Sequence, residues 1–255
     1  MAMAMVHTDL GPLFGNARDF WLGCGAADRS GADLALFRSG VSHPQLNGVL
    51  RLRHGGVDEA LHVAGHRLSG VPWLWWVGAD SRPGLAEDLL ARGAVTIGSA
   101  PVLAIELDRV YDEAGPAELV IDEVRTAAEL PEWVGAYRSS FGLTEDQLDD
   151  VVDLERTRPA EGIVRLAGRI GDRIVGTSVL FVRHGVAGVY QVATVEGCRR
   201  CGIGTRLTAA ALRAGRARGL RVGVLVSGSM GASMHRRMGF TQVAGYQLLR
   251  PPQRR

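Results

Sequence analysis

The chain has 255 residues, which is enough to bury a core either as one large domain or as two small ones. Its 29 basic and 27 acidic residues leave a formal net charge of +2, so the total charge gives no indication of a nucleic-acid partner. Every basic residue is an arginine, and the absence of lysine excludes both a Schiff-base lysine and a Walker-type phosphate site.

The cellular context follows from what the sequence lacks. No run approaches the ~18 continuous apolar residues of a membrane helix. Residues 1–10 do not combine a basic start with a long apolar run, so they do not resemble a secretion signal. Three cysteines, an odd number in a chain of this length, do not form a disulfide scaffold. We therefore expect a cytoplasmic protein that binds neither membranes nor nucleic acid, and its oligomeric state stays open.

The first half of the chain predicts alternating helices and strands. Residues 8–40 read as two helical stretches, the second around 33–37, and residues 43–52 turn from a proline-marked loop into an alternating strand. A helix over 57–68 precedes a tryptophan-rich strand at 71–77, which we expect in the core. Ser81 is the expected N-cap of a helix that ends near Gly93, and a strand at 102–107 follows. The connection after residues 71–77 has no glycine-rich loop.

The second half begins with a strand at 119–124, after a linker predicted at residues 111–117. Thr126 with Glu129, and Thr144 with Gln147, have the spacing of capping boxes, so two helices are expected there. Antiparallel strands at 163–170, 174–182 and 186–195 are joined by two short turns. Further strands are expected at 221–226 and 241–249.

The stretch at residues 190–216 is the most informative part of the sequence. A short β-branched run at 192–195 leads through a turn to Gly202 and Gly204, after which an Ala- and Leu-rich helix begins. A strand that feeds a glycine turn into a helix N-terminus directs several unpaired N–H groups at one point, which suits a phosphate or pyrophosphate. The dinucleotide-binding fingerprint does not fit, because Leu207 stands where its third glycine should be.

A rival interpretation rests on the C-x-x-C spacing of Cys198 and Cys201. A thiolate at a helix N-terminus is stabilised, as in redox sites. A structural zinc ion would need two further ligands, and Cys24 with scattered histidines offers no second closely spaced pair. A thioredoxin-type site would follow the first strand of a βαβ unit, whereas this motif follows several strands. We therefore favour the phosphate loop and expect no metal.

Two motifs resemble the GNAT superfamily of acyl-CoA-dependent N-acyltransferases. Arg199, Gly202 and Gly204 match its Arg/Gln-x-x-Gly-x-Gly/Ala signature, and residues 229–240 match a Ser-x-Met-Gly-like stretch and a short helix that ends in Gly-Phe. The matches cover roughly residues 118–250. The resemblance implies an α+β fold with a mixed, mostly antiparallel central sheet flanked by helices, in two related halves. The halves would be a degenerate GNAT-like domain at 1–110 and a GNAT acyltransferase domain at 118–255.

The resemblance also implies a set of residues for the co-substrate, acetyl-CoA or another acyl-CoA. Backbone groups of Ala193 and Val195 would pair with the pantetheine arm, and N–H groups from residues 201–205 would hold the pyrophosphate. A backbone N–H at a splay between two strands would stabilise the oxyanion. The full set of expected binding residues is Ala193, Val195, Arg199, Arg200, Cys201, Gly202, Ile203, Gly204, Thr205 and Ser229.

Catalysis is less clearly marked. The family most often has a tyrosine, thought to protonate the leaving thiolate, where this chain has His235. A neutral imidazole can donate a hydrogen bond and an imidazolium can give up a proton, so His235 is either a working replacement or a sign of lost activity. The amine must lose a proton before attack, and Glu196 is the first candidate base, beside Glu161, His184 or a chain of water molecules.

The resemblance leaves three functions open. The default is transfer of an acyl group to an amine on a small molecule. A chain that binds acyl-CoA without turnover would be a sensor or a partner protein. The donor could also be an acyl carrier protein, since it presents the same pantetheine arm, and Arg199, Arg200 and Arg206 could meet an acidic carrier.

Overall fold

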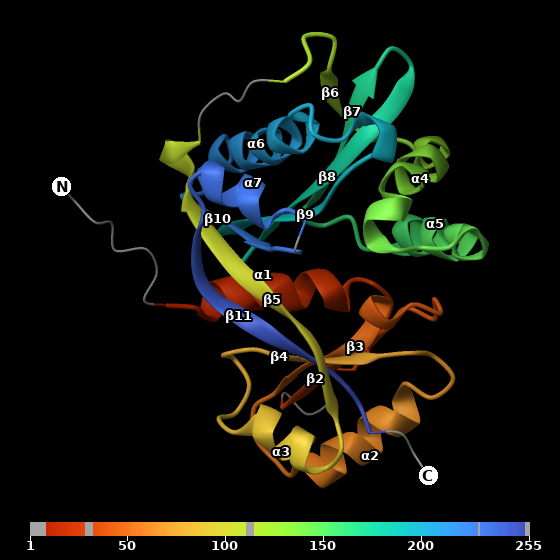
Figure 1. Cartoon of the computed structure of the whole chain (residues 1–255), viewed down its shortest axis with the longest axis vertical. Coiled ribbons are helices and arrows are strands. Elements are labelled where there is room, and N and C mark those ends of the chain that lie inside the picture. Colours follow the sequence, from red (N-terminus) through yellow and green to blue (C-terminus); the bar gives the residue numbers. More distant parts are fainter. Residues whose placement is uncertain (1–8, 29–32, 111–114, 229, 253–255) are drawn as a thin grey trace, which may run out of the picture.

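The computed structural model describes residues 9–28, 33–110, 115–228 and 230–252. Within these ranges the protein is α+β, with one twisted sheet of eleven strands that runs through the whole molecule and has helices on both faces (Figure 1). The strand order is β1-β2-β3-β4-β11-β5-β10-β9-β8-β7-β6. No helix of the described ranges has the length and apolar character needed to cross a membrane.

The elements of the first half are α1 (Gly11–Leu22), β1 (Ala26–Asp28), β2 (Leu34–Arg38), β3 (Asn47–Leu52), α2 (Val57–Arg67), β4 (Leu74–Val77), α3 (Leu85–Ala91) and β5 (Val95–Glu106). They alternate from β3 onward as the sequence predicts, but two strands, β1 and β2, precede β3. The elements of the second half are β6 (Val120–Glu123), α4 (Leu130–Phe141), α5 (Leu148–Thr157), β7 (Ile163–Ile170), β8 (Arg173–Arg183), β9 (Val186–Thr194), α6 (Ile203–Arg216), β10 (Val222–Val226), α7 (Ala232–Arg237) and β11 (Thr241–Arg250).

Each half contains one strand-helix-strand unit with parallel strands. In the first, β3 and β4 are joined through α2 and pair at Gly48 with Leu74. In the second, β9 and β10 are joined through α6 and pair at Ala187 with Gly223. Both parallel contacts are two residue pairs long, after which the strands diverge, while all other pairings of the described strands are antiparallel.

The two halves exchange their last strands. β11, the final strand of the chain, lies between β4 and β5 of the first half, and β5 in turn lies between β11 and β10 of the second half (Figure 1). Each unit of parallel strands is therefore completed by a strand from the other half. The expected boundary at residues 111–117 stays a prediction, and residues 111–114 of that linker lie outside the described ranges.

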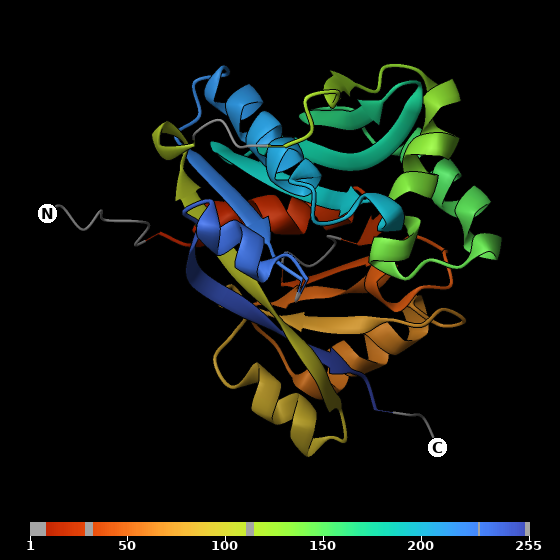
Figure 2. The ribbon, with the colours of Figure 1, turned by 45° about the horizontal axis from the view of Figure 1, so that its top comes forward.

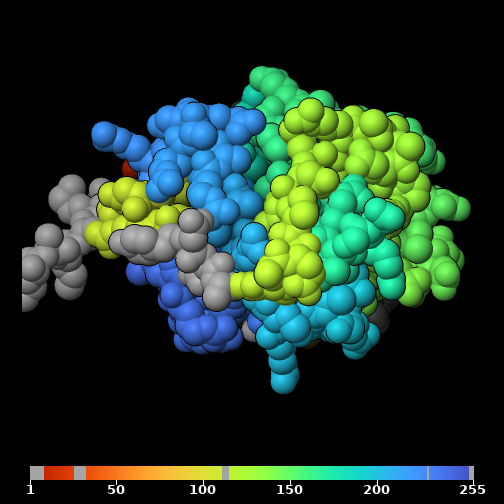
Figure 3. Space-filling view, turned by 90° about the horizontal axis from the view of Figure 1, so that it is seen from above, coloured from red at the N-terminus to blue at the C-terminus, as the bar shows by residue number. Residues whose placement is uncertain are grey.

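Helices cover the two faces of the second half differently. α6 packs on one face through an apolar stripe that includes Leu207 and Leu212, both fully buried. The opposite face is covered by α4, α5 and α1, the last of which comes from the start of the chain and crosses the centre of the molecule (Figures 1 and 2). α1 is fixed there by Asn16, whose amide donates to the carbonyls of Phe181 and Arg183. Viewed from above, the surface is formed almost entirely by the yellow-green to blue part of the chain (Figure 3).

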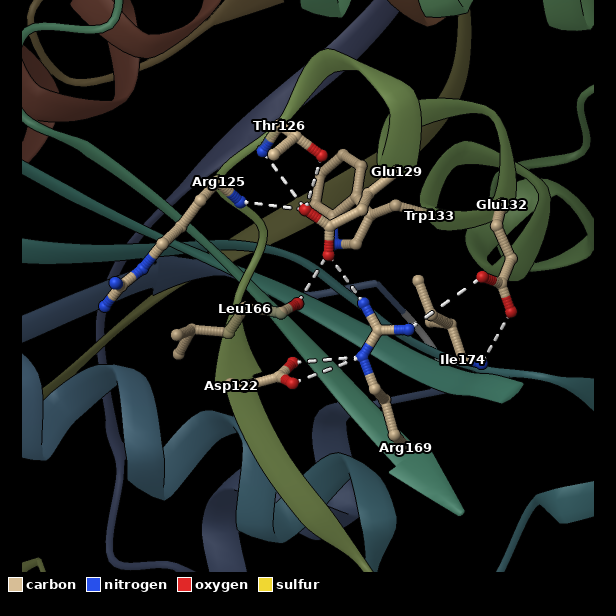
Figure 4. A network of polar contacts seen from close by, with 9 residues as sticks. All are labelled: Asp122, Arg125, Thr126, Glu129, Glu132, Trp133, Leu166, Arg169 and Ile174. Atoms are coloured by element: carbon tan, nitrogen blue, oxygen red, sulfur yellow. Dashed lines mark hydrogen bonds and ion pairs between the residues drawn. The ribbon is translucent and has the colours of Figure 1, made fainter. Parts of the chain in front are cut away.

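The capping boxes predicted for the second half are both confirmed. Thr126 with Glu129 and Thr144 with Gln147 cap short 3-10 turns that lead into α4 and α5. Arg169 of β7 extends the first cap into a network, because its guanidinium contacts Glu129 at 2.8 Å and Asp122 of β6 at 3.2 Å (Figure 4). Trp133 adds a bond from its indole N–H to the carbonyl of Leu166, 3.0 Å away (Figure 4). α4 is thus tied to two strands by charge and by packing.

Three expectations for the first half are wrong. Residues 34–37 of the second expected helix lie in strand β2, which pairs with β3. A short apolar run has no helical period long enough to decide between helix and strand. Ser81 is not the N-cap of α3; Gly84 is, with a φ of 74°. The glycine-rich turn of this half is present after all. It follows β3, where Gly55 and Gly56 lead into α2, rather than the tryptophan-rich strand.

Candidate functional site

The site begins where β9 leaves β10. The last parallel pair is Gly188 with Val224, and from there β9 stays paired with β8 as far as Thr194. β10 turns the other way, since the chain after it bonds to β5 through Ser227 N–H and Pro101 carbonyl at 2.9 Å. In the described part of the chain, no backbone hydrogen bond joins β9 to β10 beyond this fork. The edge of β9 that faces β10 is therefore available to an extended ligand.

The peptide groups on this edge belong to different residues from those predicted. Val195 donates its N–H to the carbonyl of Val175 in β8 at 2.9 Å, and its own carbonyl accepts from Cys198 at 2.8 Å, so Val195 is not available to a pantetheine arm. Neighbouring residues of a strand direct their peptide groups to opposite edges, so Ala193 also faces β8, where its register partner is Thr177. Thr194 faces the fork. The alternation is shifted by a bulge at Gln191, which no sequence pattern reveals.

The turn into α6 has the geometry of an anion site. Gly202 is the N-cap in the left-handed region with φ 84°, and Arg200 before it has φ 66°. The first helical bond runs from Arg206 N–H to Gly202 carbonyl, and no hydrogen bond of the described residues uses the N–H groups of 201–205. The first turn of α6 holds no acidic residue. These N–H groups and the positive end of the helix dipole are directed together at the end of β9.

The arginines of the turn differ in the hydrogen bonds that they form within the protein. Arg199 donates to the carbonyl of Thr194 at 3.2 Å and to Ser139 Oγ of α4 at 3.0 Å, so it fastens the turn to β9 and α4. Arg206 donates to the carbonyl of Pro116 at 2.8 Å. Arg200 is exposed.

The third component of the site is α7. A methyl group added at Gly204 would lie 3.4 Å from Met234 Sδ and 3.6 Å from Thr194 Oγ1, so the turn, the end of β9 and α7 meet at this point. His235 follows Met234 on α7. Ser229, which was expected to bind the co-substrate, lies outside the described residues.

His235 is buried, with its ring edge-on to Phe240. Ser227 Oγ lies 3.2 Å from Nδ1 and donates to the carbonyl of Gly228 at 3.0 Å, so Nδ1 carries the ring proton and Nε2 is an acceptor. Nε2 is buried and has no partner among the described residues. Burial lowers the pKa of His235 to about 4, so the ring is neutral at pH 7. Both findings disfavour an imidazolium that protonates the leaving thiolate.

None of the candidate bases is built into this site. Glu196 is exposed and its nearest ionic partner is Arg199 at 3.9 Å. His184 lies in the turn before β9, where it contacts Asp19 at 3.0 Å, and Glu161 pairs with Arg183 at the same end. That end of β9 is about 25 Å from Thr194 by strand length, at the opposite end of the strand.

The cysteines of the chain are all free thiols. Cys198 and Cys201 are both free thiols, and Cys201 is exposed within the turn. Cys24 differs from these two in its environment, because it is buried and burial raises the pKa of its thiol to about 11. Among the residues described by the structure, no group of three or more His, Cys, Asp or Glu side chains is placed to hold a metal ion.

The corresponding position in the first half is closed. The turn into α2 has the glycines, but the first turn of that helix carries Asp58 and Glu59, which repel an anion. The fork between β3 and β4 is bridged by the chain itself: Leu52 accepts from Arg82 N–H at 2.8 Å and donates its own N–H to Ser81 Oγ at 3.3 Å. The first half thus has the topology of the site without its chemistry.

Charged residues are distributed unevenly along the sequence. The first 196 residues hold 17 arginines and all 27 acidic residues, while the 12 arginines after Glu196 are accompanied by no acidic residue. The near-neutral total conceals this separation. It falls at the anion site, so the charge of separate segments would have indicated the site better than the charge of the chain.

A strand fork, an adjacent glycine turn and a helix N-terminus together have the geometry that would suit an extended ligand with a phosphate group. Residues 128–240 match the family model described as Acetyltransferase (GNAT) family. This part of the chain is therefore a domain of the GNAT acetyltransferase family.

The similarity in fold extends to the whole chain. A GCN5-related N-acetyltransferase from Kribbella flavida has 19% sequence identity and a TM-score of 0.73 over 99% of this chain and 98% of its own. A functionally unknown conserved protein from Staphylococcus epidermidis has 14% identity and a TM-score of 0.66 over 90% and 95% of the two chains. A tandem GNAT protein from the clavulanic acid biosynthesis pathway, at 16% identity, has a TM-score of 0.60 over 85% and 77%. The tandem arrangement of this chain is consistent with that likeness. Among curated proteins, none matches the sequence.

Proposed function

We propose that the chain is an acyl-CoA-dependent N-acyltransferase that acts on an amine, with one donor site in its second half. The observation that carries this proposal is the meeting of the open β9 edge with the unbonded N–H groups at the start of α6, in a domain of the GNAT family. The first supplies hydrogen bonds for a pantetheine arm, and the second supplies them for a pyrophosphate.

In this proposal the donor lies along the fork with its thioester near the point where β9 and β10 separate. The N–H of Thr194, whose carbonyl accepts from Arg199 Nε at 3.2 Å, donates to the pantetheine arm, in place of the Ala193 and Val195 predicted from the sequence. The N–H groups of residues 201–205 bind the pyrophosphate, and exposed Arg200 contributes charge at the rim. His235 stays neutral and accepts a hydrogen bond through Nε2.

The proposed acceptor is a small-molecule amine. The face of the sheet opposite α6 is covered by α1, α4 and α5 around a continuous apolar core, so little open surface beside β9 is left for a protein chain. An amine is protonated at neutral pH and must lose a proton to attack the thioester, and the absence of a built-in base favours water as the first proton carrier.

The experiment is a titration with acetyl-CoA and longer acyl-CoAs, followed by CoA release with a panel of amines. The informative variant is Gly204→Asp, which places a carboxylate at the proposed pyrophosphate position while its Cβ makes only ordinary contacts. Charge repulsion should raise the Kd for acetyl-CoA by roughly 100-fold or more, equivalent to about 3 kcal/mol. The neutral variant Gly204→Asn should raise the Kd for acetyl-CoA clearly less than Gly204→Asp does.

The matched control uses the other half. Gly56→Asp introduces the same charge at the N-terminus of α2, where a Cβ meets no atom, and should leave acetyl-CoA binding unchanged. Binding with CoA release supports the transferase. Binding of acetyl-CoA without release across all amines would instead indicate a sensor, and no binding of any acyl-CoA would overturn the donor site.

The charge distribution favours testing a second donor, an acidic acyl carrier protein. Arg200, Arg236 and Arg237 are exposed, and no acidic side chain of the described residues lies within 4 Å of their guanidinium groups. With an acetylated carrier protein as substrate, the double variant Arg236→Ala/Arg237→Ala should raise KM for the carrier and leave KM for acetyl-CoA nearly unchanged. Equal effects on both donors would argue against a carrier.

A further inference from the structure

Gln191 has an unusual backbone conformation inside a strand. Its φ is 49°, in the left-handed region that favours glycine. Three non-glycine residues of the described chain have a positive φ, namely His184, Gln191 and Arg200, and only Gln191 of these lies within a strand. A glycine would adopt this φ without strain, so the presence of glutamine indicates that its side chain is used.

The strain coincides with a bulge next to the fork. Tyr190 pairs with Val179 and Ala193 pairs with Thr177, so two residues of β9 stand opposite one residue of β8. The bulge lies three residues after Gly188, where β9 last pairs with β10. It therefore determines which peptide groups of the following residues, up to Thr194, face the fork.

The backbone and the side chain of Gln191 both form hydrogen bonds. Its carbonyl accepts a hydrogen bond from Thr177 Oγ1 at 2.7 Å, and its side-chain amide donates to Glu155 Oε1 of α5 at 2.9 Å. Since Glu155 can only accept, the amide nitrogen must face it, which leaves Oε1 of Gln191 buried and without a partner among the described residues.

Glu155 is a buried carboxylate that is held in place by two arginines. Its side chain is only 2% exposed, and its carboxylate receives Arg165 Nε at 2.9 Å and Arg158 Nη1 at 3.4 Å. Burying a carboxylate between two guanidiniums contributes little net stability compared with an apolar packing of the same volume. What such a cluster provides is a fixed position for the group that it binds, here the Gln191 amide.

We propose that Gln191 is a positioning residue, anchored by Glu155, that holds the β9 bulge so that a peptide N–H at the fork reaches the carbonyl of the bound thioester. This inference rests on the proposed function. A correctly placed N–H polarises the thioester carbonyl and stabilises the oxyanion when the amine attacks. Pyrophosphate binding depends on residues 201–205, and the direction of Thr194 is also fixed beyond the bulge, by the bond of 2.9 Å from Val195 N–H to the Val175 carbonyl. Loss of the anchor should thus affect the reaction rate and hardly affect donor affinity.

The test uses acetyl-CoA labelled with ¹³C at the thioester carbonyl. On binding to the wild-type protein, the carbonyl stretching band should move to lower wavenumber. In Gln191→Met, which keeps the shape but lacks the amide, most of that shift should disappear and CoA release should slow by roughly ten-fold or more. The Kd for acetyl-CoA should stay within about three-fold of wild type, or less than 1 kcal/mol. Gln242→Met, at an exposed position of β11, is the control.

Two further variants separate positioning from stability. Gln191→Gly relieves the backbone strain, so a purely structural role predicts full activity and our proposal predicts the same loss of rate and of carbonyl shift as in Gln191→Met. The double variant Glu155→Gln/Gln191→Met should be no slower than Gln191→Met alone, because Glu155 acts through Gln191. An unchanged carbonyl shift in the folded Gln191 variants would overturn the inference. Failure of the wild-type protein to bind acetyl-CoA would instead overturn the proposed function.

Discussion

The two strand-helix-strand units of this protein share one topology but differ at the fork between their strands and at the start of their helix. β3, α2 and β4 repeat the arrangement of β9, α6 and β10, including a short parallel contact, a fork and a glycine before the helix. In the first unit the fork is bridged by the chain at Leu52, and the helix begins with Asp58 and Glu59. In the second unit the fork is unbridged and the helix begins without an acidic residue.

The same topology therefore occurs with and without the features of an anion site. Glycine at the turn permits close approach of a ligand, but the sign of the charge in the first helical turn decides whether an anion is attracted. Hydrogen bonds across the fork decide whether the strand edge is free. The first half serves instead as a scaffold, because it provides β5 to the second half and receives β11 in return.

The largest expected effect comes from separating the units. Residues 118–255 expressed alone lack β5, which leaves β10 and β11 without their shared partner, so we expect no cooperative thermal unfolding and no acetyl-CoA binding. A protease site inserted in the predicted linker at 111–117 is the control. After cleavage of the folded protein, the two pieces should stay associated in gel filtration. Independent folding of the C-terminal piece would contradict the strand exchange.

Structures that depend on neighbouring residues could be predicted from the sequence. Structures that depend on a partner far along the chain could not. The capping boxes at Thr126 and Thr144 and the turn at Gly202 are set by neighbouring residues, and all appear in the structure. The fold class and two-part organisation followed from the GNAT-like motifs. The bulge at Gln191 arises from pairing with β8, so the edge that Val195 faces could not be read from the sequence. The exchange of β5 and β11 left no signal in either strand.

The next effect concerns His235, which has no counterpart in the first unit. Its folded-state pKa of about 4 lies below the ordinary value of 6.5, so below pH 6.5 the unfolded chain takes up a proton that the folded chain does not. This contribution to stability is complete above pH 6.5 and is lost as the pH falls toward 4. Between pH 7 and pH 5 it amounts to about 2 kcal/mol. His235→Gln should lose less stability than wild type over this range in urea titrations, while exposed His66→Gln should follow wild type.

A similar magnitude is expected for the network that ties α4 to the sheet, which the first unit also lacks. Arg169→Met removes the contacts to Asp122 and Glu129 and leaves both carboxylates without this partner. We expect a loss of about 2 kcal/mol in the free energy of unfolding. Arg173→Met, at an exposed position of β8, is the matched control. Equal stability of the two variants in urea would show that the network contributes nothing.

The smallest effect is expected at α2. Asp58 forms a surface ion pair with Arg92 across bonds of 2.5 and 2.8 Å, but its side chain is 79% exposed. Asp58→Asn should therefore leave the thermal midpoint almost unchanged. It should also create no second donor site, because the fork beside α2 stays bridged at Leu52. A second binding event in calorimetry of this variant would show that charge alone closes the first unit.

The most direct measurement is the stoichiometry of acetyl-CoA binding to the wild-type chain by isothermal titration calorimetry. One donor site per chain, abolished by Gly204→Asp and retained in Gly56→Asp, is the predicted result. Two sites per chain, or a single site lost in Gly56→Asp, would place donor binding in the first unit and contradict the difference drawn between the two halves.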